Sequence, residues 1–158
     1  MYNNKTGWYR VLNREKVIRP LDEHMCSFKE DGNNTYVMYR SSLELKAIRY
    51  ADFNKHVVKF SLEPYPIKYV KPTDGKVHRY FVDMFLEFSS GHKILVEIKS
   101  KGETMPPKKP SKNTAKSMMN FQKAVQTYSI NQAKWASAKL FAEANSMQFV
   151  VITEDELG

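Results

Sequence analysis

Two apolar segments that flank a short polar turn constrain this chain more than any other feature. Residues 79–88 and 94–99 are rich in aromatic and branched aliphatic side chains, a composition typical of β-strands. The turn between them contains Ser89-Ser90-Gly91, and a three-residue loop with glycine in the last position is a common hairpin connection. The two segments are therefore predicted to form one antiparallel hairpin within a larger sheet.

One acidic residue stands in the apolar row of each predicted strand. Side chains alternate between the two faces of a strand, so Asp83 shares a face with Phe81 and Phe85. Glu97 shares a face with Leu95 for the same reason. Asp83 and Glu97 are equally distant from the middle of the turn, so the hairpin register places them directly opposite each other, with Cβ atoms roughly 5 Å apart.

Two carboxylates at this distance repel each other unless one binds a proton or a cation lies between them. Such oxygen ligands suit Mg²⁺. Lys99 is on the same face as Glu97 and could stabilise charge that develops on a phosphate or orient an attacking water. The alternative is a surface ion network on an exposed face. Phe81, Phe85 and Leu95 favour a covered face, and a buried acid pair favours a functional site.

The remaining segments predict an α/β arrangement around this hairpin. A meander followed by a helical crossover to the last strand gives a mixed sheet flanked by helices. The predicted helices span 41–53 and 115–145, the second either continuous or broken near Ser129; the other predicted strands span 57–63, 67–71 and 148–153; and a basic, proline-bearing loop spans 100–114.

Charge and cysteine content restrict the partners and the compartment. Lys and Arg number 25 against 17 Asp and Glu, a net charge of +8 that favours an anionic partner such as nucleic acid, although solubility alone is the alternative.

Cys26 is the only cysteine, which excludes an intrachain disulfide and favours a reducing compartment. No apolar run has membrane-spanning length and residues 1–10 lack a signal-peptide stretch, so a soluble intracellular protein without a membrane partner is expected.

The acid pair and the lysine also carry a family resemblance. Val82-Asp83, thirteen residues and then Glu97-Ile98-Lys99 resembles the signature of the PD-(D/E)XK nucleases, with Val82 where that signature prefers proline. The wider chain resembles the head-completion nucleases of tailed bacteriophages and the endonuclease subunit of Tn7-type transposition. The resembling stretches, which cover most of residues 39–156, are 39–44, 63–69, 79–83, 97–101, 131–136 and 149–154.

The resemblance implies a fold and a domain organisation. The implied fold is α/β: a restriction-endonuclease-like αβββαβ core, with a mixed central sheet flanked by helices. Residues 1–158 would form a single nuclease domain, in which residues 1–38 are an N-terminal extension and residues 39–156 are the PD-(D/E)XK core. We find no pattern in the first 38 residues from which to infer a role.

The resemblance further implies roles for individual residues. The implied cofactor is Mg²⁺, with Mn²⁺ as a substitute. Glu44 fits a capping box with Ser41 equally well, and both roles stay open. Glu63 is a further candidate for the site. The residues with implied catalytic roles are Glu44, Asp83, Glu97 and Lys99, and the three acids among them would bind the metal.

Lysines near the predicted site suggest how DNA would be held. Lys101 precedes the proline-bearing part of the basic loop, and Lys108, Lys109 and Lys112 lie within it, so that together they could follow a DNA backbone. Lys134, on the long predicted helix, could contact a phosphate. Plain exposure to solvent is the alternative for the loop and for Lys134.

The function implied is that of a metal-dependent endodeoxyribonuclease, or DNA-end-processing nuclease, acting in phage head completion after DNA packaging. Its expected partners are DNA and portal or head-completion proteins, in the host bacterial cytoplasm or attached to the virion. A non-cleaving adaptor with a nuclease fold, which binds a DNA end or joins head and tail, is the alternative; a restriction or repair nuclease would share the chemistry. The complete set of Asp83, Glu97 and Lys99 favours an enzyme, because an adaptor needs no catalytic site.

Overall fold

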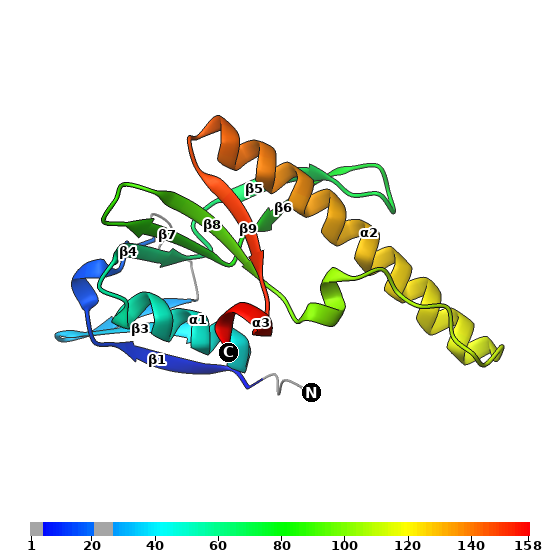
Figure 1. The fold of residues 1–158 in the computed structure, drawn as a ribbon, viewed down its shortest axis with the longest axis horizontal. Coiled ribbons are helices and arrows are strands. Elements are labelled where there is room, and N and C mark those ends of the chain that lie inside the picture. Colours follow the sequence, from blue (N-terminus) through cyan, green and yellow to red (C-terminus); the bar gives the residue numbers. More distant parts are fainter. Residues whose placement is uncertain (1–4, 21–26) are drawn as a thin grey trace.

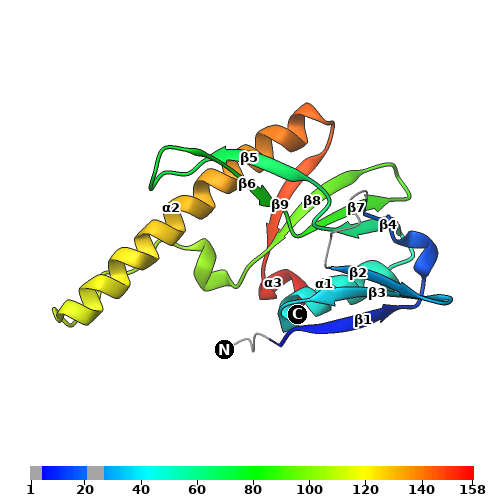
Figure 2. The same cartoon turned by 180° about the vertical axis from the view of Figure 1, so that it is seen from behind.

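A computed structural model describes residues 5–20 and 27–158, and Figures 1 and 2 show the fold from opposite sides. Cys26 lies outside the described residues. The elements are β1 (Gly7–Val11), η1 (Arg14–Lys16), β2 (Phe28–Asp31), β3 (Asn34–Tyr39), α1 (Ser42–Phe53), β4 (Val57–Leu62), β5 (Pro66–Val70), β6 (Val77–Phe81), β7 (Met84–Phe88), β8 (Lys93–Ile98), η2 (Lys101–Thr104), α2 (Ala115–Ala144), β9 (Gln148–Ile152) and α3 (Glu154–Leu157).

A four-stranded mixed sheet, in the order β4-β7-β8-β9, forms the centre of the fold. β4, β7 and β8 are antiparallel neighbours, whereas β9 reaches the sheet through α2 and runs parallel to β8. The predicted α/β class, with a mixed sheet flanked by helices, is therefore confirmed. Among the described residues, none of the helices combines the length and the apolarity that a membrane crossing requires.

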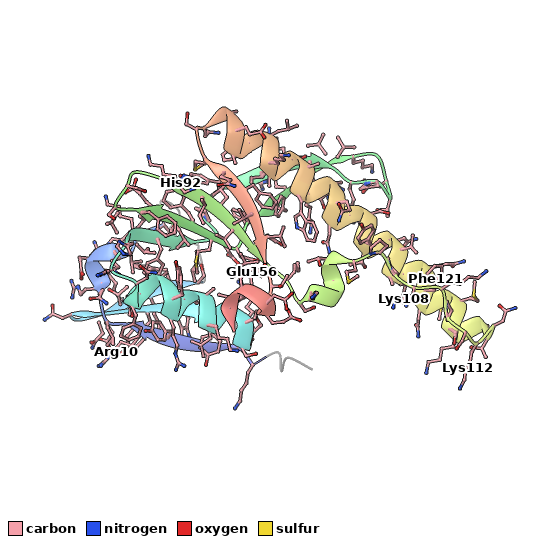
Figure 3. The ribbon with its side chains drawn as sticks, viewed as in Figure 1. Arg10, His92, Lys108, Lys112, Phe121 and Glu156 are labelled. Atoms are coloured by element: carbon pink, nitrogen blue, oxygen red, sulfur yellow. The ribbon has the colours of Figure 1, made fainter. Side chains whose placement is uncertain are left out.

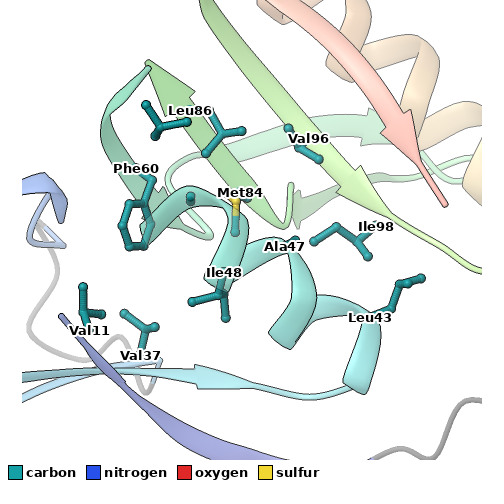
Figure 4. Packing of buried hydrophobic residues seen from close by; sticks show 12 residues of the cluster. Val11, Val37, Leu43, Ala47, Ile48, Phe60, Met84, Leu86, Val96 and Ile98 are labelled. Carbon is teal, nitrogen blue, oxygen red and sulfur yellow. The ribbon is translucent and has the colours of Figure 1, made fainter. Parts of the chain in front are cut away.

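Two hydrophobic clusters pack against opposite faces of this sheet. Figure 4 shows the first, which contains Ile48 of α1, Phe60 of β4 and Ile98 of β8. The second contains Leu95 of β8 and Ala138 of α2, together with residues of β5 and β6. Alternation along β8 thus sends neighbouring side chains into different cores. As a result, α1 covers one face of the sheet, and α2 with the β5–β6 hairpin covers the other.

The single strand predicted over residues 79–88 is wrong, because the chain breaks at Val82-Asp83. β6 pairs with β5, whereas β7 pairs with β4 and β8. Two hydrogen bonds fix the break. The Asp83 carboxylate accepts the backbone N–H of Ile98 at 2.8 Å, and the Asp83 carbonyl accepts the backbone N–H of Glu63 at 3.0 Å. The chain therefore leaves one sheet and enters another at this residue.

The hairpin after the break is confirmed, with its predicted register. Leu86 pairs with Ile94, and Gly91 occupies the last loop position with φ at +87°, a left-handed conformation that glycine adopts at no steric cost. α2 is continuous through Ser129, so no break interrupts the long helix.

The described N-terminal residues form a three-stranded sheet, in the order β1-β3-β2, which sequence reasoning missed. A buried carboxylate ties this sheet to the end of α1. The Asp52 side chain is 0% exposed and accepts hydrogen bonds from the Tyr9 hydroxyl, from the backbone N–H of Leu12 and from both the backbone and side-chain N–H of Asn13. Burial alone would raise the pKa of Asp52, but these hydrogen bonds outweigh it and lower the pKa.

Replacing Asp52 with asparagine should destabilise the fold, because an amide leaves part of this charged network with unpaired donors, at a cost of about 2 kcal/mol. The folded-state pKa is depressed, so the stabilisation is fully present above the usual Asp pKa of about 3.9 and is lost as the pH falls through the folded-state value. Urea unfolding should show the full difference between wild type and Asp52→Asn at pH 7 and a smaller one below about pH 4.

The matched control is Asp31→Asn in the exposed β2–β3 turn, which should change the unfolding free energy by less than about 0.5 kcal/mol. An equal loss for Asp52→Asn at acid and neutral pH would contradict the assignment of a charged network.

Candidate active site

Asp83 and Glu97 face each other at the open end of the β7–β8 hairpin. The last pair of the ladder is Met84 with Val96, so one further step in the same register places Asp83 opposite Glu97. The hydrogen bond from the Ile98 N–H holds the Asp83 carboxylate at this position. The structure thus brings the two acids together, although Asp83 itself lies in the break between strands.

The face that carries the acids is covered. Phe85 and Leu95 are buried in the same cluster as residues of α2, as their apolar character predicts. Phe81 does not belong to this row, contrary to the prediction, because it lies in β6 before the break; it is 42% exposed. Glu97 is only 6% exposed, so its carboxylate is largely withdrawn from water.

Burial leaves the acid pair short of partners. In the described part of the chain, the buried Glu97 Oε2, the Tyr80 hydroxyl and the Trp135 indole N–H form no hydrogen bond of good geometry, although the Trp135 N–H lies close enough to Glu97 to lower the pKa of that acid. Burial raises the pKa of Asp83 to about 8, and the neighbouring charge of Glu97 adds to this effect. Burial also raises the pKa of Glu97, which Lys99, with Nζ 4.0 Å from Glu97 Oε1, offsets only in part. The site therefore disfavours the ionisation of both acids.

The donor set of this pair fits a divalent cation. Mg²⁺ is usually held by one or two carboxylates, while waters and substrate phosphates complete its coordination. Asp83 and Glu97 supply two carboxylates, and one oxygen of Glu97 has no hydrogen-bond partner among the described residues. Among residues 5–20 and 27–158, no three His, Cys, Asp or Glu side chains form a cluster that could hold a metal alone. A two-carboxylate site completed by substrate and water is the arrangement that fits.

Glu44 and Glu63 lie beside the pair, and Arg40 connects them. Both acids line a small cavity together with Asp83 and Arg40. The Glu44 carboxylate accepts the backbone N–H of Arg40 at 2.6 Å, and the Arg40 guanidinium forms an ion pair with Glu63. Glu63 has a left-handed φ of +46°, a costly conformation of the kind that clusters at functional sites. Their roles at a metal stay predictions.

The predicted capping box between Ser41 and Glu44 is only half formed. Ser41 Oγ accepts the Glu44 N–H at 3.1 Å, as a helix N-cap does. The Glu44 carboxylate reaches the N–H of Arg40 rather than that of Ser41, so its return contact is one residue away from the predicted one. Glu44 therefore supports the start of α1 and borders the cavity at the same time.

Lys134 is the predicted DNA-contacting lysine that the structure brings to the acids. Its Nζ lies 5.7 Å from the ring centroids of both Tyr69 and Tyr80. Burial lowers its pKa, while the nearby charge of Glu97 acts in the opposite direction. The alternative of a fully solvated lysine is wrong, because the side chain is half-buried.

The other predicted lysines lie outside the centre. Lys101 forms an ion pair with Asp155 of the C-terminal helix α3 at 2.8 Å, so the charge of Lys101 is already paired within the protein. Lys108, Lys109 and Lys112 are exposed on the segment before α2; Figure 3 shows Lys108 and Lys112 near the end of α2 that lies away from the sheet.

Arg40 and Tyr80 are neighbours of the acids that sequence reasoning missed. Burial raises the pKa of Tyr80, and the charges of Glu97 and Asp83 add to the effect, which places its phenol close to the pair. Arg40 precedes a helix cap and Tyr80 lies in an apolar strand, so neither position suggests a role before the long-range contacts are known.

Two comparisons with known proteins bear on this site. The family described as TnsA-like endonuclease N terminal matches residues 54–154, a span that includes Asp83, Glu97 and Lys99 but not Glu44. The chain is also similar to the head completion nuclease of Enterobacteria phage T4. The two are 35% identical over 129 residues, which cover 82% of this chain and 86% of the phage protein.

Asp83→Asn should stabilise the metal-free protein at neutral and mildly alkaline pH. The folded-state pKa of about 8 lies above the usual value, so the carboxylate destabilises the fold increasingly as the pH rises from about 4 toward 8. Asparagine removes this ionisation and keeps an oxygen for the Ile98 N–H. In EDTA, Asp83→Asn should melt above wild type at pH 8, and the difference should be absent near pH 4.

Glu87→Gln is the matched control, because Glu87 lies on β7, the strand that begins just after Asp83, but is part-exposed and paired with Lys93 at 3.6 Å. It should not show this pH-dependent gain. If Asp83→Asn melts below wild type at pH 8, the carboxylate is not held in an unfavourable charged state.

Proposed function

The chain belongs to the TnsA-like endonuclease family, and on this premise we propose that it is a divalent-metal-dependent deoxyribonuclease that hydrolyses phosphodiester bonds. The observation that carries the proposal is the buried Glu97 oxygen without a partner, opposite the carboxylate of Asp83. A protein that only binds DNA has no reason to maintain such a pair, because it costs stability.

Asp83 and Glu97 would hold the metal, and Glu44 would support it from the neighbouring cavity wall. Mg²⁺ is the cation that this donor chemistry favours, and Mn²⁺ is expected to replace it. When bound, the cation supplies positive charge that polarises the phosphate and makes water more acidic. The protein's own part is to fix the two carboxylates: the Ile98 N–H orients Asp83, and the cover from α2 keeps water from solvating Glu97.

Lys99 is proposed as the catalytic lysine. Its ammonium lies 4.0 Å from Glu97 Oε1, close enough to approach a phosphate bound at the same carboxylate. Its backbone N–H donates to the carbonyl of Ile152 in β9 at 3.1 Å, which fixes the chain at this residue. A lysine in this place can stabilise the charge that develops on the phosphate or orient the attacking water.

The biological role that we propose is processing of DNA ends in phage head completion. The name of the phage T4 relative, a head completion nuclease, supports this role. The protein would then act in the host bacterial cytoplasm or on the virion, with DNA and portal or head-completion proteins as partners. The acid pair and lysine favour this enzyme over a non-cleaving adaptor.

Asp83→Asn and Glu97→Gln should each abolish cleavage of plasmid DNA in Mg²⁺, because each removes a charged ligand while keeping the side chain's shape. Wild type should nick or linearise the plasmid in Mg²⁺ and lose that activity in EDTA. Glu87→Gln, at an acid on β7 away from the pair, is the control and should cut like wild type. Undiminished cleavage by either site variant, or equal cleavage in EDTA, would contradict the proposal.

Glu44→Gln separates a helix cap from a catalytic acid. The amide oxygen can still accept the Arg40 N–H, so the loss of stability should stay below about 1 kcal/mol. Cleavage should nevertheless fall strongly, because a neutral oxygen replaces a charge near the metal. A melting curve and a plasmid-nicking assay on the same preparation test both points. Unchanged cleavage would leave Glu44 as a cap alone.

A further inference from the structure

The segment that runs from the end of η2 almost to the end of α2 has an unusual charge. The 39 residues from Thr104 to Ala142 contain seven lysines and no arginine, aspartate or glutamate. A long stretch with one sign of charge repels itself unless an opposite charge is nearby. Within it we define the basic arm as residues 105–127, which carry Lys108, Lys109, Lys112, Lys116 and Lys123.

The basic arm has no core of its own. No residue from 105 to 127 is buried, and the first buried residue of α2 is Asn131. Figures 1 and 2 show the first half of α2 projecting from the body, with the preceding extended segment beside it. Ala115 and Thr127 are twelve residues apart along the helix, so the helical part of the arm is roughly 18 Å long. Exposed helix of this length needs a purpose other than packing.

The chain enters the basic arm from the neighbourhood of the acid pair and returns to that neighbourhood after it. At one end, β8 delivers Glu97 and Lys99, and the chain enters the arm a few residues later through η2. At the other end, α2 returns to the body at Lys134, which lies over Tyr69 and Tyr80. A polymer lying along the arm would therefore be led toward the candidate active site.

We propose that the basic arm binds the backbone of duplex DNA beside the bond to be cut, without reading the base sequence. This inference rests on the proposed function, since it takes the substrate to be DNA. Phosphates of one strand are spaced about 3.4 Å apart along the duplex axis, so the helical part of the arm, roughly 18 Å long, spans about five of them. The exposed lysines of the arm, whose own sequence contains no acid, match such a row of charges.

A protein partner is the alternative occupant. The arm exposes Met119 by 51% and Val125 by 39%, which a second copy or a virion protein could cover. These are scattered single apolar residues among charges of one sign, however, and such exposure is ordinary for a surface helix. The charge of the arm favours DNA.

The test compares how the affinity for duplex DNA depends on salt. A labelled duplex of about 24 base pairs, long enough to cover the arm at about five phosphates per strand, is titrated in EDTA by fluorescence anisotropy between about 50 and 200 mM salt. The variant is Lys108→Gln, Lys109→Gln and Lys112→Gln combined. The matched control is Lys55→Gln, Lys59→Gln and Lys93→Gln combined, which removes the same charge from β4, from the residues just before it and from the start of β8.

Each phosphate contact that is lost makes the slope of log affinity against log salt about 0.9 shallower. We therefore expect the slope of the arm variant to be up to about 2.7 shallower than that of wild type. The control should keep the wild-type slope. Equal slopes for wild type and arm variant overturn the inference, and so does a change of oligomeric state in light scattering without a change of slope.

The plasmid assay in Mg²⁺ separates this inference from the proposed function. Wild-type cleavage together with equal slopes means that the protein is a nuclease whose arm does not meet the phosphates. Absence of both duplex binding and cleavage in wild type overturns the inference and the proposed function together.

Discussion

The hydrogen bond from the Ile98 N–H to the Asp83 carboxylate, at 2.8 Å, is the interaction on which the arrangement of this protein depends. The Asp83 side chain accepts the hydrogen bond that a backbone carbonyl of a neighbouring strand would otherwise accept. It does so at the point where the chain passes from the β5–β6 hairpin into the central sheet. Without it, the end of β8 would present an unsatisfied N–H beside a covered face. The same bond fixes a carboxylate opposite Glu97, so the feature that terminates one strand also builds the site.

The hydrophobic packing around the site stabilises it, whereas the buried charges of its two acids act against it. Hydrophobic clusters on both faces of the sheet hold β7 and β8 in register, whatever the charge on the acids. Within that frame, burial raises the pKa of both Asp83 and Glu97. Proteins tolerate such local conflict mainly where function requires it, and perturbed carboxylates in a covered setting are typical of catalytic centres.

The pairing of Asp83 with Glu97 could be predicted from the sequence because both residues belong to one short hairpin. A short loop and an alternating pattern are enough to set the hairpin register, and the register alone opposes Asp83 and Glu97. The strand break could not be predicted, because it depends on Glu63, which pairs with Asp83 from a different part of the chain. The same holds for the contact of Arg40 with Glu63, which lies 23 residues further along the chain. Sequence patterns show which residues are close along the chain, whereas Glu63 meets Asp83 and Arg40 only in the folded structure.

The parallel pairing of β9 with β8 has a consequence for synthesis on the ribosome. The hairpin with its two acids can assemble as soon as it emerges, since its contacts are close in sequence. The backbone of Lys99, in contrast, is held by Ile152, which is translated only after the whole of α2. The backbone at Lys99 is therefore fixed last, after the two acids of the hairpin have formed their local contacts.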